Sequence, residues 1–173
     1  MKKIFLIGYM GAGKTTIGKR LARMLDVQFI DLDIFIESRH RKKVSEIFAE
    51  KGESGFREIE RDALREVRQF DNVVISTGGG TPCFFDNMQV MNEAGQTIYL
   101  KLTPNELATR LIKSNKKGTR PLLSGKSDNE ILQFVIDSLA VREPFYSQST
   151  CIFEAGNLDI EEKLELLAKN LAN

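Results

Sequence analysis

Gly8-Tyr9-Met10-Gly11-Ala12-Gly13-Lys14-Thr15 is the stretch of the chain that predicts its fold. The spacing G-x-x-x-x-G-K-T is the P-loop pattern, a glycine-rich loop that cradles phosphates with main-chain N–H groups. The apolar run before it, residues 4–7, is typical of a buried strand, and residues 16–25 carry apolar side chains at helical spacing. Strand, glycine loop and helix in this order form the context that the motif requires. The alternative is a glycine-rich turn that binds nothing.

The residue types in this loop suit the binding of a nucleotide. Glycines allow successive N–H groups to point into one concavity, and the positive end of the following helix favours a phosphate there. Lys14 is expected to reach the outer phosphates, and the Thr15 hydroxyl is expected to ligate Mg²⁺. The predicted ATP-binding residues of the loop are Gly11, Ala12, Gly13, Lys14, Thr15 and Thr16.

Length and composition indicate one soluble globular domain. The chain has 173 residues, 42% of them hydrophobic and 28% charged. Lys and Arg number 25 against 24 for Asp and Glu, so no overall field attracts nucleic acid or a membrane. The two cysteines, Cys83 and Cys151, match no metal-binding spacing and are expected to be buried thiols.

The beginning of the chain imitates a signal peptide, with two lysines ahead of an apolar run. Lys14 interrupts that run early, no small-residue cleavage site precedes it, and the P-loop needs the run as a strand. We therefore expect a cytoplasmic protein, and no stretch approaches the roughly 20 apolar residues of a membrane span.

Strands and helices are predicted to alternate along the whole chain. This pattern is typical of an α/β fold, here a five-stranded parallel sheet flanked by helices. Ser45, Thr103 and Ser127 are expected to precede helices as N-caps, and Gly52 is expected to end a short helix. The expected strands are residues 28–33, 73–77, 97–102 and 151–153 besides the first, and further helices are expected at 34–37, 53–70, 85–92, 103–113, 127–139 and 160–171.

Two acids, Asp31 and Asp33, end the second predicted strand. In an extended chain a spacing of two places both side chains on one face, and strand carboxyl ends border the ligand crevice of such sheets. Asp31 is then a candidate for the metal, and Asp33 for accepting a proton or hydrogen bond from an acceptor hydroxyl. The alternative is a helix N-terminus capped by two acids.

Three successive glycines, Gly78-Gly79-Gly80, follow the third predicted strand. They suit a place where a ligand approaches the main chain, although a plain turn is the alternative. Many P-loop enzymes have an Asp for Mg²⁺ on this strand, whereas this chain has Ser76, so part of that role is open to Asp31.

Residues 110–126 contain six basic side chains and no acid. A flexible basic segment between two helices is typical of a lid that closes on phosphates, and a solvated run of charge is the alternative. Arg120 is the candidate for stabilising charge on the transferred phosphoryl group. Arg57 and Arg142 suit the recognition of a carboxylate, but nothing in their spacing pairs them, and two surface salt bridges explain them equally well.

Taken in order, these segments resemble the shikimate kinases over nearly the full chain. Leu32 departs from the small or hydroxyl residue usual in that family, which is expected to affect packing alone. The resemblance rests on residues 8–16, Asp31-Leu32-Asp33, Gly52-Glu53 with Phe56-Arg57 and Glu60, Ser76 with Gly78-Gly79-Gly80, Arg120-Pro121-Leu122 and Arg142-Glu143-Pro144-Phe145-Tyr146.

The resemblance implies a P-loop fold like that of nucleoside monophosphate kinases and the ATP-dependent phosphorylation of the 3-hydroxyl of shikimate, on the chorismate route to aromatic amino acids. It implies one kinase domain with a substrate-binding lobe near residues 33–60 and a lid near 113–125, and we expect a monomer. The implied shikimate-binding residues are Asp33, Arg57, Gly79, Gly80 and Arg142. It assigns Lys14 and Arg120 to the phosphates, with Lys14, Asp33 and Arg120 as the catalytic residues. It assigns Thr15 and Asp31 to Mg²⁺, and Arg110 and Asn157 to the adenine side.

Two other classes compete with this interpretation. One is a kinase of another polyol acid, such as gluconate, or of a nucleotide. The other is a slowly hydrolysing nucleotide switch. The chain has no recognisable N-K-x-D motif for guanine, which counts against the switch. An acid at Asp33 counts against a nucleotide acceptor, so ATP consumption with shikimate, gluconate and AMP side by side distinguishes the candidates.

Overall fold

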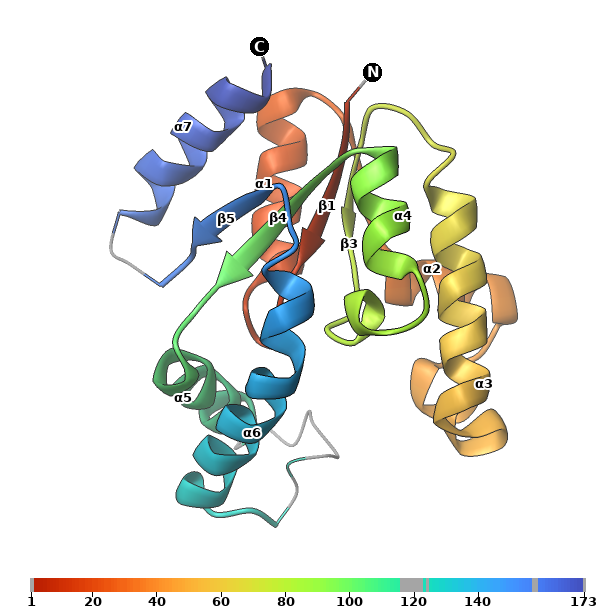
Figure 1. Cartoon of the computed structure of the whole chain (residues 1–173), viewed down its shortest axis with the longest axis vertical. Coiled ribbons are helices and arrows are strands. Elements are labelled where there is room, and N and C mark those ends of the chain that lie inside the picture. The colour runs from red at the N-terminus through yellow and green to blue at the C-terminus, as the bar shows by residue number, and fades with distance from the viewer. Residues whose placement is uncertain (1, 116–122, 124, 157–158, 173) are drawn as a thin grey trace.

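The computed structural model describes residues 2–115, 123, 125–156 and 159–172 of the chain. Within them five parallel strands form one sheet in the order β2-β3-β1-β4-β5 (Figure 1), so the predicted fold class is confirmed. The strands are β1 (Lys3–Ile7), β2 (Gln28–Asp31), β3 (Val73–Ser76), β4 (Gln96–Lys101) and β5 (Cys151–Glu154).

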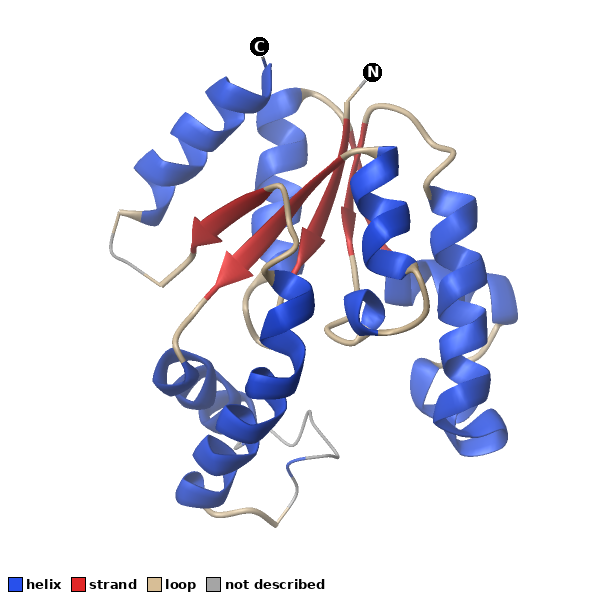
Figure 2. Ribbon diagram, in the orientation of Figure 1, coloured by secondary structure: helices blue, strands red, loops and turns tan. Residues whose placement is uncertain are grey.

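The central strands are apolar because helices cover both faces of the sheet. All four residues of β3 are buried, as are the last four of β1, which is the pattern expected of parallel strands inside an α/β fold. Helix α1 (Lys14–Leu25) packs with α7 (Ile160–Ala172) on one face, and α4 (Asn87–Ala94) lies on the other with α3 (Val44–Val67) beside it (Figure 2).

The carboxyl ends of the strands all lie at one edge of the sheet, where ligands bind in open α/β folds. There β1 leads into the P-loop, β2 into α2 (Leu32–His40) and β3 into the glycine turn and the short helix η1 (Thr81–Cys83). Helices α5 (Pro104–Asn115) and α6 (Asp128–Tyr146) pack against each other at the same end of the molecule (Figure 1). The fold thus gathers distant segments around the P-loop.

The prediction of an extended chain through Asp33 is wrong. Strand β2 ends at Asp31, and Asp33 lies in the first turn of α2. The Asp31 carboxylate accepts hydrogen bonds from the main-chain N–H groups of Asp33 and Ile34, at 3.1 and 3.4 Å. An N-cap acid satisfies the otherwise unpaired donors of a first helical turn, and this ends the strand two residues early. The capping alternative therefore describes the backbone here.

The predicted N-cap at Ser45 is also wrong, because α3 already begins at Val44. The Glu46 carboxylate accepts a hydrogen bond of 2.6 Å from the main-chain N–H of Lys43 and fixes the start there. Gly52, at a φ of 69°, interrupts the helical backbone, as predicted, before the chain becomes helical again. Smaller differences are that α4 starts at Asn87 and ends at Ala94, and that Cys83 and Cys151 are only half-buried. None of the described helices has the length and apolar character that a membrane crossing requires.

Candidate active site

A cavity of about 320 Å³ lies at the carboxyl ends of β1, β2 and β3. The P-loop forms one wall, the start of α2 another, and the glycine turn after β3 the third. It is lined by Met10, Gly11, Gly13, Lys14, Thr15, Thr16, Asp31, Asp33, Ser76, Thr77, Gly78 and Gly79.

The P-loop has the backbone that its glycines predict. Gly11 and Gly13 have φ values of 81° and 95°, a left-handed conformation that glycine adopts at little cost. Gly13 directly precedes α1, so the first N–H groups of that helix face the cavity end of the loop. Lys14 is only 8% exposed, and its Nζ donates hydrogen bonds to the carbonyl oxygens of Gly8 and Tyr9, at 2.8 and 2.9 Å. The loop thus presents main-chain donors and one ammonium group to an anion.

The residues predicted for a metal, Thr15 and Asp31, are in contact. Thr15 Oγ1 donates a hydrogen bond of 2.9 Å to Asp31 Oδ2, and Asp31 is paired in register with Ser76 on β3. No cluster of three or more His, Cys, Asp or Glu is found in the part of the chain that the structure describes. A hydroxyl and a single carboxylate fit Mg²⁺, which prefers oxygen ligands and is completed by water and substrate phosphates.

The surroundings of the Asp33 carboxyl group disfavour its charged form. Its pKa is raised from 3.8 to about 6, chiefly by burial and then by the nearby carboxylates of Asp31 and Glu60, while the Lys14 ammonium partly opposes this rise. A pKa near 6 leaves the group mostly ionised at neutral pH yet able to accept a proton. This environment therefore suits the Asp33 carboxylate for interaction with the hydroxyl group of an acceptor.

The glycine turn after β3 is the meeting point of the remaining predicted residues. A Cβ placed on Gly78 would lie 3.4 Å from Asp33 Oδ1, and one on Gly79 would lie 3.4 Å from Arg142 Nη1 and 3.3 Å from the main-chain N of Met10 in the P-loop. A Cβ on Gly80 would lie 2.4 Å from Arg57 Nη2, closer than real contacts allow. At Gly80 a side chain would overlap Arg57, whereas Asp33 and Arg142 approach Gly78 and Gly79 at contact distance.

Arg57 and Arg142 come from different helices, α3 and α6, and reach neighbouring glycines of this turn. Arg57 is 8% exposed, and its Nη1 donates a hydrogen bond of 2.7 Å to Glu60, a carboxylate that is 1% exposed. The Arg142 guanidinium lies over the Tyr9 ring, 5.4 Å from its centroid. Two guanidinium groups therefore border the same end of the cleft. Their positive charge contrasts with the negative charge of the Asp33 carboxylate.

The sequence analysis did not predict the side-chain contacts that hold this turn, although Glu60 and Tyr146 are among the residues that carry the family resemblance. Tyr146 donates a hydrogen bond of 2.5 Å to the carbonyl oxygen of Gly79, and Thr81 donates one of 2.6 Å to Glu60. The Phe84 ring lies against Arg57. The spacing of Arg57 and Glu60, three apart on a helix, could have predicted their ion pair, whereas no local pattern indicates the contacts of Thr81 and Phe84.

The residues predicted for the adenine side are only partly described. Arg110, on α5, donates hydrogen bonds to the carbonyl oxygens of Ala12, at 3.1 Å, and Ala155, at 3.4 Å. It therefore bridges the P-loop and the segment after β5. Arg120 and Asn157 lie outside the described residues.

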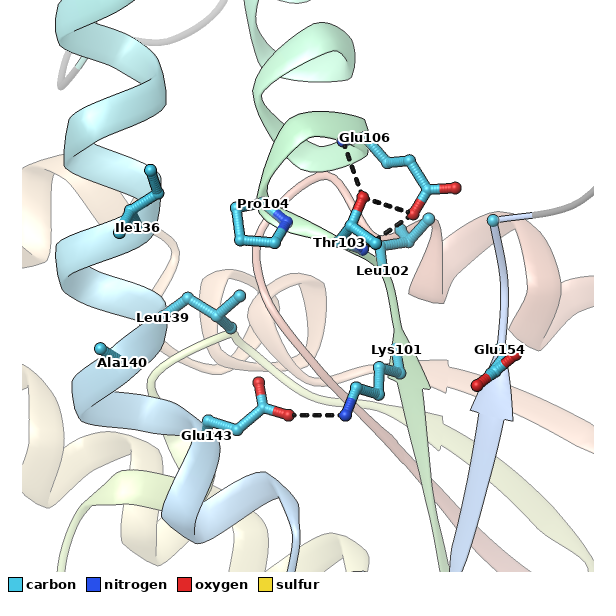
Figure 3. A pocket seen from close by; sticks show the side chains of 11 residues that line it. Lys101, Leu102, Thr103, Pro104, Glu106, Ile136, Leu139, Ala140, Glu143 and Glu154 are labelled. Atoms are coloured by element: carbon cyan, nitrogen blue, oxygen red, sulfur yellow. Dashed lines mark hydrogen bonds and ion pairs between the residues drawn. The ribbon is translucent and has the colours of Figure 1, made fainter.

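A larger cavity of about 530 Å³ lies between the ends of β4 and β5 and helices α5 and α6 (Figure 3). Three acidic side chains line it, Glu106, Glu143 and Glu154. Glu143 accepts from Tyr99 Oη at 2.9 Å and pairs with Lys101 Nζ at 3.1 Å. Glu106 accepts from the main-chain N–H of Thr103 at 2.8 Å, as the cap of α5. These carboxylates would repel a phosphate, so the smaller P-loop cavity is the candidate active site.

Comparison with known proteins gives one family. The model of a family described as shikimate kinase matches residues 10–171. Proteins named shikimate kinase from Parabacteroides distasonis and Bacteroides thetaiotaomicron are 52% and 53% identical to this chain. Each alignment covers 99% of this chain, and it covers 98% of the first relative and 97% of the second.

Solved structures agree with the sequence comparison. A crystal structure of shikimate kinase from Bacteroides thetaiotaomicron matches with a TM-score of 0.93 and 52% identity, over 99% of each chain. A structure of shikimate kinase from Acinetobacter baumannii in complex with shikimate matches with a TM-score of 0.81 and 31% identity, over 98% of this chain and 94% of that one.

Proposed function

Because the chain belongs to the shikimate kinase family, we propose that the P-loop cleft performs that family's reaction through the residues that line it. The chain is a phosphotransferase with an alcohol as acceptor: it phosphorylates the 3-hydroxyl of shikimate with ATP, on the chorismate route to aromatic amino acids. The convergence of Asp33, Arg57 and Arg142 on the glycine turn beside the P-loop carries the assignment of roles.

The P-loop half of the cleft binds ATP in this proposal. Main-chain N–H groups of residues 11–16 surround the phosphates, and Lys14 neutralises the charge that builds on the transferred group. Arg110 covers the adenine in this proposal, which is supported by its hydrogen bonds to the carbonyl oxygens of Ala12 in the P-loop and Ala155 after β5. Arg120 and Asn157 join this group by family resemblance, Arg120 at the phosphates and Asn157 at the adenine.

Thr15 and Asp31 would hold Mg²⁺ through the hydroxyl and the carboxylate that already contact each other. When bound, the ion supplies positive charge that neutralises the phosphate oxygens. The reaction of the family is ATP-dependent, and the metal is part of our proposal.

The glycine-turn half of the cleft binds shikimate. The guanidinium groups of Arg57 and Arg142 match the planar carboxylate of the substrate, and Gly79 and Gly80 let the ring approach the main chain. Asp33 accepts a hydrogen bond from the ring hydroxyls. Because the arginines hold the carboxylate of shikimate and Asp33 holds its hydroxyls, the orientation of the ring determines which hydroxyl oxygen faces the P-loop.

In the transfer step, the 3-hydroxyl oxygen forms a bond to the γ-phosphorus as the bond from that phosphorus to the β-γ bridging oxygen breaks. The leaving oxygen departs with ADP, and the hydroxyl proton passes to Asp33, whose raised pKa suits it as an acceptor. Phosphoryl transfer places little demand on a base, so orientation of the hydroxyl by Asp33 is the larger contribution.

We also propose that the chain works as a cytoplasmic monomer with one kinase domain. Asp33, Arg57 and Arg142 meet around the glycine turn within one copy of the chain, so the proposed site needs none of these side chains from a second copy. In this arrangement residues 33–60 form the substrate-binding lobe. The segment near 113–125 is the lid in our proposal, and its residues 116–122 and 124 lie outside the described part of the chain.

The test is ATP consumption by the purified chain with shikimate, gluconate and AMP offered separately. We expect turnover with shikimate and background rates with the other two. The phosphorylated position is then identified by NMR of the product. Faster turnover with gluconate or AMP, or a product phosphorylated at another hydroxyl, would contradict the proposal.

A further inference from the structure

The segment that follows the glycine turn reaches back to Arg57. Phe84 comes directly after η1, and its ring centroid lies 4.2 Å from Arg57 Cζ. Two other rings, Phe56 and Phe48, lie farther from this atom, at 5.4 and 6.0 Å, and stack on each other. Phe84 therefore makes the closest of the three aromatic contacts with the guanidinium.

The nitrogen atoms of Arg57 explain why a ring is useful at this place. Nη1 donates to Glu60 at 2.7 Å, Nη2 donates to Glu53 at a long 3.4 Å, and buried Nε has no hydrogen-bond partner within the described part of the chain. A further carboxylate would occupy the donors that a substrate carboxylate needs. An aromatic face attracts the cation without accepting its in-plane hydrogen bonds.

The backbone around Phe84 is held in place by hydrogen bonds on both sides. The main-chain N–H of Cys83 donates to the carbonyl oxygen of Gly80 at 2.9 Å, and the buried side chain of Asn87 donates to that of Thr81, also at 2.9 Å. The Thr81 hydroxyl in turn donates to Glu60, which is the counter-ion of Arg57. The ring and the counter-ion of Arg57 are thus fixed by the same short segment.

We propose that Phe84 is a positioning residue for shikimate binding, which acts by holding the Arg57 guanidinium with its ring face while leaving N–H donors available to the substrate carboxylate. This inference rests on the proposed function, because it takes Arg57 as a ligand of shikimate. Phe84 itself makes no contact with the substrate in this arrangement.

The chain contains a matched control at the next position. The Phe85 ring lies 4.9 Å from Arg61 Cζ, which is the same type of contact, but Phe85 is 56% exposed and Arg61 is paired with Asp62 at the surface. Replacement of Phe85 by leucine removes an Arg–Phe contact of similar geometry outside the cleft. It separates a specific effect on Arg57 from the general loss of such a contact.

The experiment compares steady-state kinetics of the wild type with those of Phe84→Leu, Phe84→Tyr and Phe85→Leu, each checked for folding by thermal unfolding. We expect Phe84→Leu to raise the KM for shikimate about five- to tenfold, with kcat and the KM for ATP within about twofold. Phe84→Tyr keeps the ring face and should behave like the wild type, as should Phe85→Leu. If Phe84→Leu does not fold, Phe84→Met takes its place.

A double-mutant cycle tests whether Phe84 acts through Arg57. In the Arg57→Ala background, Phe84→Leu should add nothing to the increase in KM. An equal increase in that background, an unchanged KM in the single variant, or a tyrosine variant as impaired as the leucine one would each overturn the inference. Failure of the proposed function is a different result, because the wild type and Phe85→Leu would then leave shikimate unphosphorylated.

Discussion

The two halves of the cleft are built in opposite ways. The phosphate-binding half comes from one contiguous stretch, residues 8–16, and offers mainly main-chain groups in a backbone fixed by glycines. The acceptor half is assembled from α2, α3, the glycine turn and α6, and offers the side chains of Asp33, Arg57 and Arg142. In our proposal the first half activates the phosphoryl group and the second selects the acceptor. We therefore expect variants in the two halves to change kcat and the two KM values in different ways.

The largest expected effect is that of Lys14→Ala, in the phosphate-binding half. We expect kcat with shikimate to fall at least about 10³-fold, because the variant loses the ammonium that we propose neutralises the transferred phosphoryl group. Acceptor-independent ATP hydrolysis should fall as well. The control is Lys19→Ala, an exposed lysine on the same helix. Turnover of Lys14→Ala close to that of the control would remove Lys14 from the mechanism.

Next in size is Asp33→Asn, at the border between the halves. The amide keeps the shape of the side chain but loses the charge that holds the acceptor hydroxyl in its reactive orientation, and it cannot accept the proton, so kcat should fall about 10²-fold or more. The wild-type rate should decline as the pH falls below about 6, because the carboxyl group becomes protonated there. A wild-type pH profile that is flat between 5 and 7 would contradict the assignment of this group.

The same variant should be more stable than the wild type at neutral pH. The pKa of Asp33 is raised in the folded state, so its stabilising contribution is complete below about 4 and is lost as the pH rises through about 6. The rise from 3.8 to about 6 corresponds to about 3 kcal/mol of unfolding free energy. Asn avoids this loss. In urea unfolding, Asp33→Asn should therefore have a higher free energy of unfolding than the wild type at pH 7.5, and the difference should disappear near pH 4. An equal difference at both pH values would contradict this explanation.

Arg142→Ala tests the acceptor half alone. The KM for shikimate should rise about 10- to 100-fold with loss of charge-assisted hydrogen bonds to the carboxylate, whereas the KM for ATP should stay within about twofold. Arg65→Ala is the control, since that arginine pairs with Asp86 at the surface. Equal increases in both KM values would mean that Arg142 does not bind the acceptor, and the distinction between the halves would fail at that residue.

The same contrast explains what the sequence can and cannot predict. The P-loop is predictable because each of its functions follows from the local backbone, and the order of strand, loop and helix is visible around it. The break at Gly52 was predictable for a similar reason. The contact between Thr15 and Asp31 is consistent with the expectation that strand carboxyl ends border one crevice. The backbone at Asp31 and Asp33 was harder to predict. The Asp31 side chain competes with the strand for the local N–H groups, and the sequence does not show whether the strand continues or a capped helix begins.

In the acceptor half, the pairing of Arg57 with Arg142 could be predicted only by family resemblance. Arg57 and Arg142 are far apart in the sequence, and only the packing of α3 and α6 around the glycine turn brings them to neighbouring residues. Phe84 shows the limit more clearly, since an aromatic residue in a turn is ordinary and its contact with Arg57 depends on how η1 directs the chain. Side-chain clusters from several elements are a property of tertiary structure.

The smallest effect is expected of Gly80→Ala. This variant distinguishes two reasons for a glycine in the turn, backbone freedom and space for a neighbouring side chain. Gly80 has a φ of −88° and a ψ of −17°, which alanine adopts without strain, so backbone freedom does not require glycine at this position. The added methyl group would instead overlap Arg57, whose Cζ and Nη1 both lie 2.8 Å from the Cβ position. We expect the displaced guanidinium to raise the KM for shikimate about fivefold, with the KM for ATP unchanged. Once Arg57 is replaced by alanine, Gly80→Ala should cost nothing more. A further increase in that background would show that Gly80 serves the substrate directly, through its main chain, as the P-loop glycines are proposed to serve the nucleotide.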